Sequence, residues 1–247
     1  NSLLPGTYII NQSSDLEEII EILSTYKPKI DKITIPEGYK TSQIKEMTQN
    51  FCLNECNIEH KVFQISSLEN LNNYEGLLFP DTYYLDSNNH NPNQLVNKML
   101  DNFVSKLPKD YQSKLLELPK KDLYSALKVA SLIEKEVRTN KDKQLVSGII
   151  WKRYKSGWTL GIDAALLYNK DNNIITYEDL QKDDPYNLRK NKGLPPTPIC
   201  NPGYESIYAA LNPEYSDYWF YLSKKSDGST VFSKTNEEHN QNKQRYL

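Results

Sequence analysis

The sequence is poor in the residues that mark specialised classes of protein. Only 9 of its 247 residues are glycine and only 3 are cysteine. So little glycine excludes a collagen-like chain, and no glycine-rich phosphate-binding loop is present. Three dispersed cysteines give no disulfide framework, and the C-x3-C spacing of Cys52 and Cys56 is not that of a zinc knuckle. The sequence therefore implies no metal and no cofactor.

The sequence also lacks a surplus of one charge and any long apolar run. Its 30 basic and 32 acidic residues leave a formal charge of −2. A protein that coats nucleic acid needs a basic surplus, so nucleic acid is not an expected partner. No apolar run approaches the roughly 20 residues of a membrane-spanning helix. What remains is a polar chain that is long enough for one large domain or two smaller ones.

Two regions of different character follow one another along the chain. Residues 1–70 predict a small unit in which strands and helices alternate. Ser14 and Glu17 have the spacing of a capping box for its first helix. The strands are predicted at 6–10 and 33–35, and the helices at 16–23 and 41–50. The stretch that follows is rich in Asn, Tyr and Pro, so we place a domain boundary between residues 70 and 71.

The second region, residues 71–247, is mainly helical. Asn201 and Pro202 are predicted as the N-cap and first residue of one helix, and Thr235 with Glu238 as the cap of the last. Helices are predicted at 93–107, 110–118, 121–138, 141–156, 201–211 and from 235 onward, with a hairpin at 218–222 and 230–232. Helices and short strands in separate runs predict an α+β fold.

One carboxylate of the helix at 121–138 falls on its apolar side. At about 100° per residue, Glu134 lies in a stripe with Leu127 and Ala130, whereas Glu136 points elsewhere. Burial beside apolar side chains favours the protonated carboxyl, which is the form that a general acid needs. The alternative is a purely structural role, in which Glu134 forms an ion pair with Arg138 or with a lysine from another segment. The spacing alone leaves both open.

Several strings in the sequence, taken in order, resemble the YceG-like family of endolytic murein transglycosylases. The strongest surrounds Glu134 and matches the family's Ala-Ser-Ile-[Ile/Val]-Glu-Lys-Glu. The matching strings are Pro5-Gly6-Thr7-Tyr8, Ile35-Pro36-Glu37-Gly38, Glu75-Gly76-x-x-Phe79-Pro80-Asp81-Thr82-Tyr83, Ala130-Ser131-Leu132-Ile133-Glu134-Lys135-Glu136, Asp184-Pro185-Tyr186-Asn187, Gly193-Leu194-Pro195-Pro196-Thr197-Pro198-Ile199, Asn201-Pro202-Gly203, Ser206-Ile207-x-Ala209-Ala210-Leu211-Asn212-Pro213 and Glu238-His239-Asn240. Together they cover nearly the whole chain, which makes the set very specific.

The resemblance implies a fold, an activity and a location. It implies a LysM-like N-terminal module at 1–70 and a YceG-like catalytic domain at 71–247. It implies cleavage of the bond between N-acetylmuramic acid and N-acetylglucosamine within nascent peptidoglycan strands, with the family's catalytic glutamate on Glu134. It also implies a single-pass anchor in the cell membrane preceding Asn1, an extracytoplasmic domain, and peptidoglycan synthases as candidate partners.

Two strings depart from the family pattern. Where the family often has Gln-Thr-Asp or Gln-Ser-Asp, this chain has Gly161-Ile162-Asp163, so a glutamine is missing while Asp163 is kept. Where many members have Gly-Gly-His-Thr-Phe in the hairpin, this chain has Gly228-Ser229-Thr230-Val231-Phe232, so the histidine is missing.

A transglycosylase of this kind needs one carboxylate and a shell of polar groups that hold the sugars. The attacking hydroxyl belongs to the substrate itself, so proximity replaces a second carboxylate. Plainer roles compete for these residues: a helix cap for Asn201 and Asp163, a loop brace for Glu136, and a turn for Tyr186 and Asn187. The candidate substrate contacts are Glu136, Asp163, Tyr186, Asn187, Thr197 and Asn201.

Three other functions would make different demands on these residues. A hydrolytic muramidase would use Glu134 with Glu136, Asp163 or Asp81 as the second carboxylate. A non-catalytic peptidoglycan-binding scaffold would not need Glu134 as an acid. A pyridoxal-phosphate lyase would need a phosphate-binding loop, for which the sequence gives no support.

Overall fold

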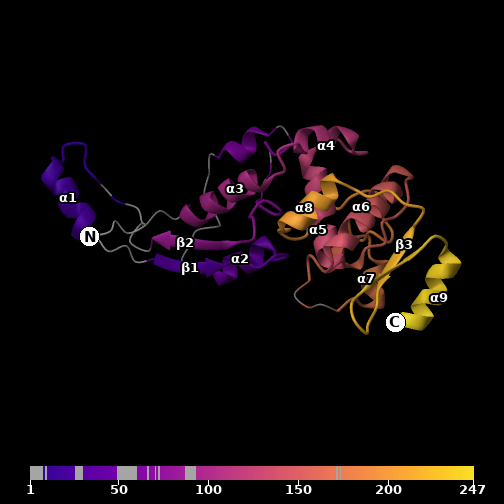
Figure 1. Cartoon of the computed structure of the whole chain (residues 1–247). Helices are drawn as coiled ribbons and strands as arrows, with labels where there is room; N and C mark the ends of the chain where they lie inside the picture. Colours follow the sequence, from indigo (N-terminus) through magenta and orange to yellow (C-terminus); the bar gives the residue numbers. More distant parts are fainter. Residues whose placement is uncertain are drawn as a thin grey trace.

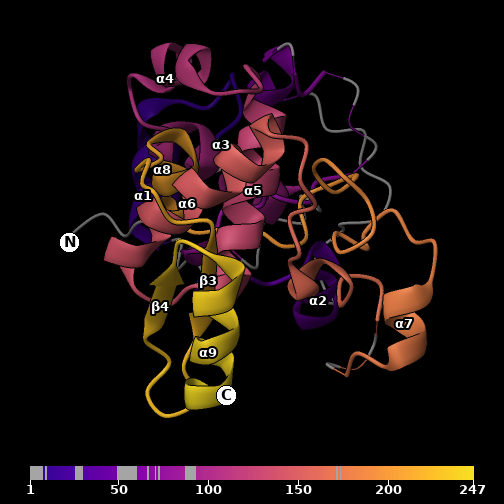
Figure 2. The ribbon, with the colours of Figure 1, turned by 90° about the vertical axis from the view of Figure 1, so that its right-hand side faces the viewer.

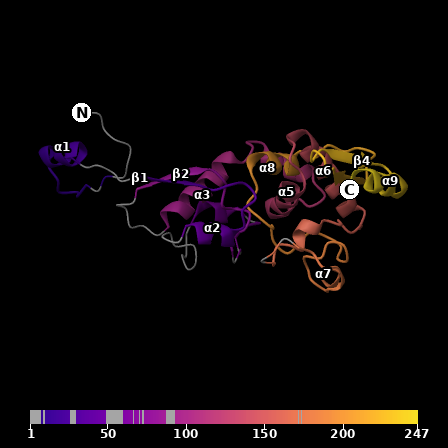
Figure 3. The same ribbon diagram turned by 90° about the horizontal axis from the view of Figure 1, so that it is seen from below.

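The computed structural model is an elongated, mostly helical molecule (Figures 1 and 3). Helix α1 (Leu16–Thr25) lies at one end, and the C-terminal hairpin with helix α9 (Asn236–Tyr246) lies at the other. The residues that the structure describes are 8, 10–25, 30–48, 60–65, 67–69, 71, 73–86, 93–170, 172 and 174–247.

Helix α1 confirms the first predicted helix, but not its predicted cap. The Glu18 amide donates to Asp15 Oδ1 at 2.9 Å and the Asp15 amide donates to Glu18 Oε2 at 3.3 Å. The capping box is therefore formed one residue later than the predicted Ser14 and Glu17. None of the residues of α1 is buried. Of the predicted strand at 6–10, residues 8 and 10 are described and are not in a strand, and the others lie outside the described residues. The helix predicted at 41–50 ends at Met47, and residues 49 and 50 lie outside the described residues.

A two-stranded antiparallel sheet connects the two predicted regions. Strand β1 (Ile30–Thr34) pairs with strand β2 (Thr82–Asp86), with Ile30 opposite Asp86 and Thr34 opposite Thr82. The pairing crosses the predicted boundary at 70/71, which stays a prediction. Around this sheet lie α2 (Thr41–Met47), the short helix η1 (Lys61–Gln64) and α3 (Gln94–Lys106).

The centre of the molecule is a group of helices around α5 (Leu123–Glu136). Asp122 begins α5 by accepting a hydrogen bond from the Ser125 amide at 2.8 Å. Helices α6 (Asn140–Lys155) and α8 (Tyr204–Leu211) pack on α5 (Figure 2), and α4 (Tyr111–Glu117) packs on α8. The predicted helices are confirmed here, but α8 begins at Tyr204 rather than at Pro202.

The C-terminal part adds a second small sheet. Strands β3 (Phe220–Ser223) and β4 (Thr230–Ser233) form the predicted hairpin, and α9 packs on it after the predicted cap at Thr235. The short helix α7 (Tyr177–Gln181) was not predicted, and the short helix η2 (Asp163–Ala165) includes Asp163 instead of being capped by it. Two small sheets among helices, within the described part of the chain, confirm the α+β class.

One continuous apolar core runs through both predicted regions. Ile35, Ile44 and Val62 come from the N-terminal side of the boundary and belong to the same buried cluster as Leu127 and Ala130 of α5. All five side chains are at most 2% exposed. The segment from β1 onward is therefore packed against the helix that carries Glu134.

Candidate active site

Glu134 lies in the last turn of α5 and points at the start of α8. Its Oε2 accepts hydrogen bonds from the Gly203 amide at 3.1 Å and from the Ser206 hydroxyl at 2.7 Å. Lys143 Nζ of α6 lies 3.7 Å from the same oxygen, and the side chains of Lys143 and Glu134 are 5% and 10% exposed. Unpaired amides at a helix N-terminus and a lysine are groups that stabilise a carboxylate.

This environment corrects the predicted apolar surroundings of Glu134. Leu127 and Ala130 are fully buried, as the stripe predicts. At Glu134 itself, however, polar groups from α6 and α8 replace apolar neighbours. The predicted alternative, an ion pair, is formed with Lys143 of another helix and not with Arg138.

The turn after β1 lies close to the Glu134 side chain. A Cβ built on Gly38 would lie 3.6 Å from Glu134 Cγ and 3.5 Å from Lys135 Nζ. Gly38 has a φ of 76°, and its amide donates to the Asn201 carbonyl at 2.9 Å. The left-handed φ favours glycine, whereas a Cβ at this position would make only ordinary contacts with α5. The predicted N-terminal module thus supplies one wall of the site.

Glu37 of the same turn is a functional candidate that sequence reasoning missed. Its carboxyl group packs on Gly203, since a Cβ there would lie 1.9 Å from Glu37 Oε1. Burial raises the pKa of Glu37, and the charge of Glu134 raises it further, whereas Lys143 lowers it. The available signal was the carboxylate inside the string Ile35-Pro36-Glu37-Gly38, in a segment that the sequence assigns to a separate module.

Asn201 is fully buried and joins three segments of the chain. Its Oδ1 accepts hydrogen bonds from the Gly76 and Leu78 amides, both at 2.9 Å. Its Nδ2 donates to Glu75 Oε1 at 3.2 Å and to the Tyr39 carbonyl at 3.1 Å. The predicted role as a helix cap is wrong, because Gly203 is the N-cap of α8. The structure does not bring this side chain to a surface that a ligand could reach.

Glu75 is a second carboxylate that sequence reasoning missed, although it lies in a matching string. It is 3% exposed and accepts hydrogen bonds from the Thr41 amide and from the Tyr168 hydroxyl. Burial raises the pKa of Glu75 to about 7, against the lowering effect of these two bonds and of Lys40. Glu75 therefore holds α2, Tyr168 and Asn201 together.

Tyr186 and Thr197 are brought together as a pair. Their hydroxyl oxygens lie 2.8 Å apart, and the ring centroids of Tyr186 and Tyr168 lie 5.0 Å apart. Both Tyr186 and Thr197 are half-buried. Since Tyr168 bonds to Glu75, the pair is connected to Asn201 and the turn beside Glu134 by a chain of contacts.

Asn187, by contrast, stabilises a loop and does not face a possible ligand. Asn187 is fully buried. Its Nδ2 donates hydrogen bonds to the carbonyls of Leu180 and Lys182 at 3.0 and 3.1 Å. These bonds hold the loop that follows α7. As placed, Asn187 does not reach a ligand surface.

Glu136 and Asp163 form a separate cluster. Glu136 accepts hydrogen bonds from the Tyr221 hydroxyl and the Ala164 amide, and burial raises its pKa to about 7, with the charge of Asp163 adding to the rise. Asp163 pairs with Arg189, with Nη2 and Oδ2 2.7 Å apart. The N-cap of η2 is Ile162, so the predicted cap role of Asp163 is not seen. Glu136 and Glu134 point to different neighbours, as the helical spacing predicts.

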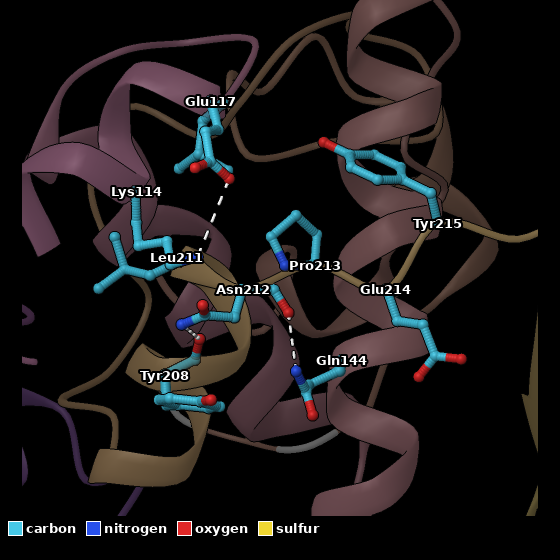
Figure 4. A pocket seen from close by; sticks show the side chains of 10 residues that line it. Lys114, Glu117, Gln144, Tyr208, Leu211, Asn212, Pro213, Glu214 and Tyr215 are labelled. Carbon is cyan, nitrogen blue, oxygen red and sulfur yellow. Dashed lines mark hydrogen bonds and ion pairs between the residues drawn. The ribbon is translucent and has the colours of Figure 1, made fainter. Parts of the chain in front are cut away.

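A cavity of about 340 Å³ lies between α4, α6 and the C-terminal end of α8 (Figure 4). Lys114 and Glu117 line it from α4, Gln144 from α6, and Tyr208 from α8. Figure 4 shows the bond from Gln144 Nε2 to the Asn212 carbonyl, which is 2.9 Å long. None of the predicted site residues lines this cavity. Glu134 therefore remains the candidate active-site residue.

The part of the chain that the structure describes contains neither a metal-binding cluster nor a membrane-spanning helix. No group of three or more His, Cys, Asp or Glu side chains could hold a metal ion there. None of the helices in that part is both long enough and apolar enough to cross a bilayer.

The fold and the site define an α+β protein in which a central helix presents one carboxylate to the N-terminus of a neighbouring helix. The chain belongs to the YceG-like family, whose model matches residues 1–245. This finding confirms the resemblance that the sequence strings carried.

Similarity to named proteins and to a solved structure agrees with this family assignment. The chain is 31% identical to a Bacillus subtilis (strain 168) protein named endolytic murein transglycosylase, over 98% of this chain and 72% of that protein. It is 25% identical to a protein of the same name from Streptococcus pneumoniae serotype 2 (strain D39), over 97% of this chain and 50% of that protein. It thus spans about half the length of the pneumococcal relative.

A crystal structure of a yceG-like protein from Listeria monocytogenes superposes with a TM-score of 0.71. The two sequences are 29% identical, and the match covers 91% of this chain and 80% of the other. The architecture described above is therefore that of a solved member of the family.

Proposed function

We propose that this chain is an endolytic lytic transglycosylase that cleaves the bond between N-acetylmuramic acid and N-acetylglucosamine within nascent peptidoglycan strands. The observation that carries the proposal is the carboxylate of Glu134, which lies in a family string and is held by Gly203 and Ser206. Membership of the YceG-like family and the names of the relatives support the same activity. An enzyme with this substrate acts in the cell envelope.

The first half of the reaction uses Glu134 as an acid. The protonated carboxyl gives its proton to the bridging oxygen, and the bond from that oxygen to C1 of the muramic acid breaks. The N-acetylglucosamine leaves with a new hydroxyl group. The Gly203 amide, the Ser206 hydroxyl and the Lys143 ammonium stabilise the ionised carboxylate that this step leaves behind.

The second half uses the same carboxylate as a base. The C6 hydroxyl of the muramic acid attacks C1 of its own ring, and Glu134 takes the proton from O6. A 1,6-anhydro ring forms and the acid is regenerated, so no water is consumed. Because the nucleophile belongs to the substrate, one carboxylate suffices.

The remaining predicted contacts divide by their position. In the proposal Tyr186 and Thr197, which are half-buried, contact the glycan. Asn187 and Asn201 act indirectly by fixing loops, and Glu136 and Asp163 brace the end of α5 against β3 and Arg189.

The proposal extends to the organisation of the protein in the cell. Residues 1–70 form a LysM-like module and 71–247 form the catalytic domain. A single-pass membrane anchor precedes the chain and holds it outside the membrane, where peptidoglycan synthases supply its substrate. Family membership supports these points.

The test is digestion of purified peptidoglycan, with the products analysed by mass spectrometry. We expect anhydro ends from the wild type and a 10²–10⁴-fold slower reaction from Glu134→Gln, because an amide cannot transfer the proton. Glu136→Gln is the matched control, since its side chain points to Tyr221 and Ala164, and it should retain activity.

The products also separate the competing functions. A hydrolase adds one water and leaves a reducing end instead of an anhydro end. A Glu134→Gln variant that supports normal growth would favour a binding scaffold. If Glu136→Gln were inactive and Glu134→Gln active, the assignment of the acid would be wrong.

A further inference from the structure

Gly203 lies between two carboxylates that come from distant parts of the sequence. Its amide donates to Glu134 Oε2 at 3.1 Å. On its other side, a Cβ would lie 1.9 Å from Glu37 Oε1 and 2.3 Å from Glu37 Cδ. Only a residue without a side chain leaves room for the Glu37 carboxyl group in that position. The two glutamates are therefore separated by one peptide unit of main chain.

The main chain of Glu37 is held in this position by its neighbours. The Gly38 amide donates to the Asn201 carbonyl, and the Asn201 amide donates to the Tyr39 carbonyl, both at 2.9 Å. Gly38 itself lies against Glu134 Cγ. Although the Glu37 side chain is only partly covered by its neighbours, its backbone is fixed beside the candidate acid.

The charges around Glu37 come from every element that packs on the turn. Glu134 and Lys135 lie on α5, Lys143 on α6 and Glu205 on α8. Burial raises the pKa of Glu37, the charges of Glu134 and Glu205 raise it further, and Lys143 lowers it. Electrostatic repulsion between two groups acts equally on both. A charged Glu37 therefore disfavours a charge on Glu134.

We propose that Glu37 is a positioning residue that keeps Glu134 in its proton-donating form through the charge that it presents across Gly203. The proposal rests on the proposed function of Glu134. Lys143 and the start of α8 stabilise the ionised carboxylate that the second half-reaction needs, and Glu37 opposes them so that the first half-reaction has a proton to give. Two carboxylates in one site that divide these roles are a recurrent device of enzymes.

The inference also explains why the site needs the N-terminal part of the chain. The predicted catalytic domain at 71–247 contains Glu134, Lys143, Gly203 and Ser206, but not Glu37. Since the turn at 36–38 supplies both Glu37 and a wall of the site, the predicted module contributes to the reaction as well as to glycan binding.

The experiment is a pH profile of peptidoglycan cleavage by the full chain, for the wild type, Glu37→Gln and Glu205→Gln. Glutamine keeps the size of the side chain and removes its charge. For Glu37→Gln we expect about tenfold lower activity at neutral pH. Its loss of activity with rising pH should begin at a lower pH than in the wild type, because one like charge near the acid is gone. Glu205→Gln removes a charge from the same region without the contact on Gly203 and should stay within about twofold of wild type.

Two results with a folded Glu37→Gln protein would overturn the inference. One is an unchanged rate and profile. The other is a rate that is lower by the same factor at every pH, which indicates a structural role only. Circular dichroism and thermal unfolding establish that the variant is folded.

A second measurement does not depend on activity or on the folding of Glu37→Gln. The side-chain carboxyl carbons of glutamate are followed by NMR during a pH titration of wild type and Glu134→Gln. We expect the titration midpoint of Glu37 to fall in Glu134→Gln, because the neighbouring charge is removed. An unchanged midpoint would overturn the inference. A wild type that cleaves no glycan would instead contradict the proposed function, while the titration still decides the coupling.

Discussion

The Glu134 carboxylate is held by one main-chain amide, one hydroxyl and one ammonium group. Helical spacing gives the direction in which Glu134 leaves α5, and that direction is confirmed by the burial of Leu127 and Ala130. The partners of the carboxylate are Gly203, Ser206 and Lys143, which lie on other elements. At the residue scale, a single glycine separates Glu134 from Glu37 and so controls their arrangement.

We expect Gly203→Ala to lower activity about tenfold without unfolding the protein. The φ of Gly203 is −77°, which any residue adopts. The new Cβ would meet Glu37 at 1.9 Å, but the group it meets is the end of a flexible, exposed side chain that can move away. The free energy of unfolding should therefore change by less than about 1 kcal/mol. Anhydro product formation and chemical denaturation are the two measurements.

Gly148→Ala is the contrasting variant. A Cβ on Gly148 would lie 2.0 Å from the Glu214 carbonyl oxygen and 2.7 Å from its carbonyl carbon. Because that neighbour is main chain, we expect a destabilisation of about 1–3 kcal/mol, with activity lost only as the protein unfolds.

A fully active Gly203→Ala protein would contradict the first of these two predictions. It would show that the position of Glu37 does not affect the reaction.

At the scale of elements, the site exists because three segments meet at one buried amide. Asn201 connects the turn after β1, the segment that precedes β2 and the segment that leads into α8. Each of these segments is irregular and has amides without partners in a helix or sheet. A buried side chain with two donors and an acceptor satisfies several of them at once.

We expect Asn201→Ala to reduce the free energy of unfolding by on the order of 3 kcal/mol, since the Gly76 and Leu78 amides would stay buried without an acceptor. Activity should fall with it, because the turn beside Glu134 loses its anchor. Urea denaturation measures the first effect and product formation the second.

Asn212→Ala serves as the control for that variant. Asn212 Nδ2 bonds only to the Tyr208 carbonyl one turn earlier, in an exposed contact. Its removal should cost less than about 1 kcal/mol. Equal costs for the two asparagines would contradict the anchoring role of Asn201.

At the scale of the whole molecule, the N-terminal and C-terminal regions share a core and a buried carboxylate. Ile35 and Ile44 belong to the cluster that contains α5. Glu75 bonds to Thr41 of α2 and to Tyr168, which follows η2. Ionisation of Glu75 places a charge in this shared interior, so the stability of the whole chain depends on pH.

We expect Glu75 to make the protein less stable as the pH rises from about 4.5 to about 7. The pKa of Glu75 is raised from its usual 4.5 to about 7 in the folded protein. In that interval the unfolded chain loses a proton that the folded chain keeps, so folding becomes less favourable with rising pH. The total is on the order of 3 kcal/mol and levels off above pH 7.

The measurement compares denaturation of the wild type and Glu75→Gln across this range. Glutamine cannot lose a proton, so its stability should lack this component and the difference between the two proteins should grow in favour of the variant up to about pH 7. A constant difference from acid to neutral pH would show that Glu75 is already ionised in the folded protein.

Sequence patterns alone were sufficient to identify the family, most of the helices and the direction of Glu134. Apolar spacing and caps such as that at Thr235 are local, so α3, α5, α6 and α9 could be predicted. The α+β class followed from those elements. The ordered strings identified the family, and the family model then confirmed it.

The groups that surround the acid come together only when the chain folds. Hydrogen bonds such as those of Asn201 and Glu75 join residues far apart in sequence, and no periodicity encodes such pairs. For the same reason Asn201 and Asn187 were predicted as ligand contacts although both are buried, and Glu37 was assigned to a separate module. Its place beside Glu134 arises because the turn at 36–38 packs on the last turn of α5 and the first residue before α8, a contact that only the folded chain creates.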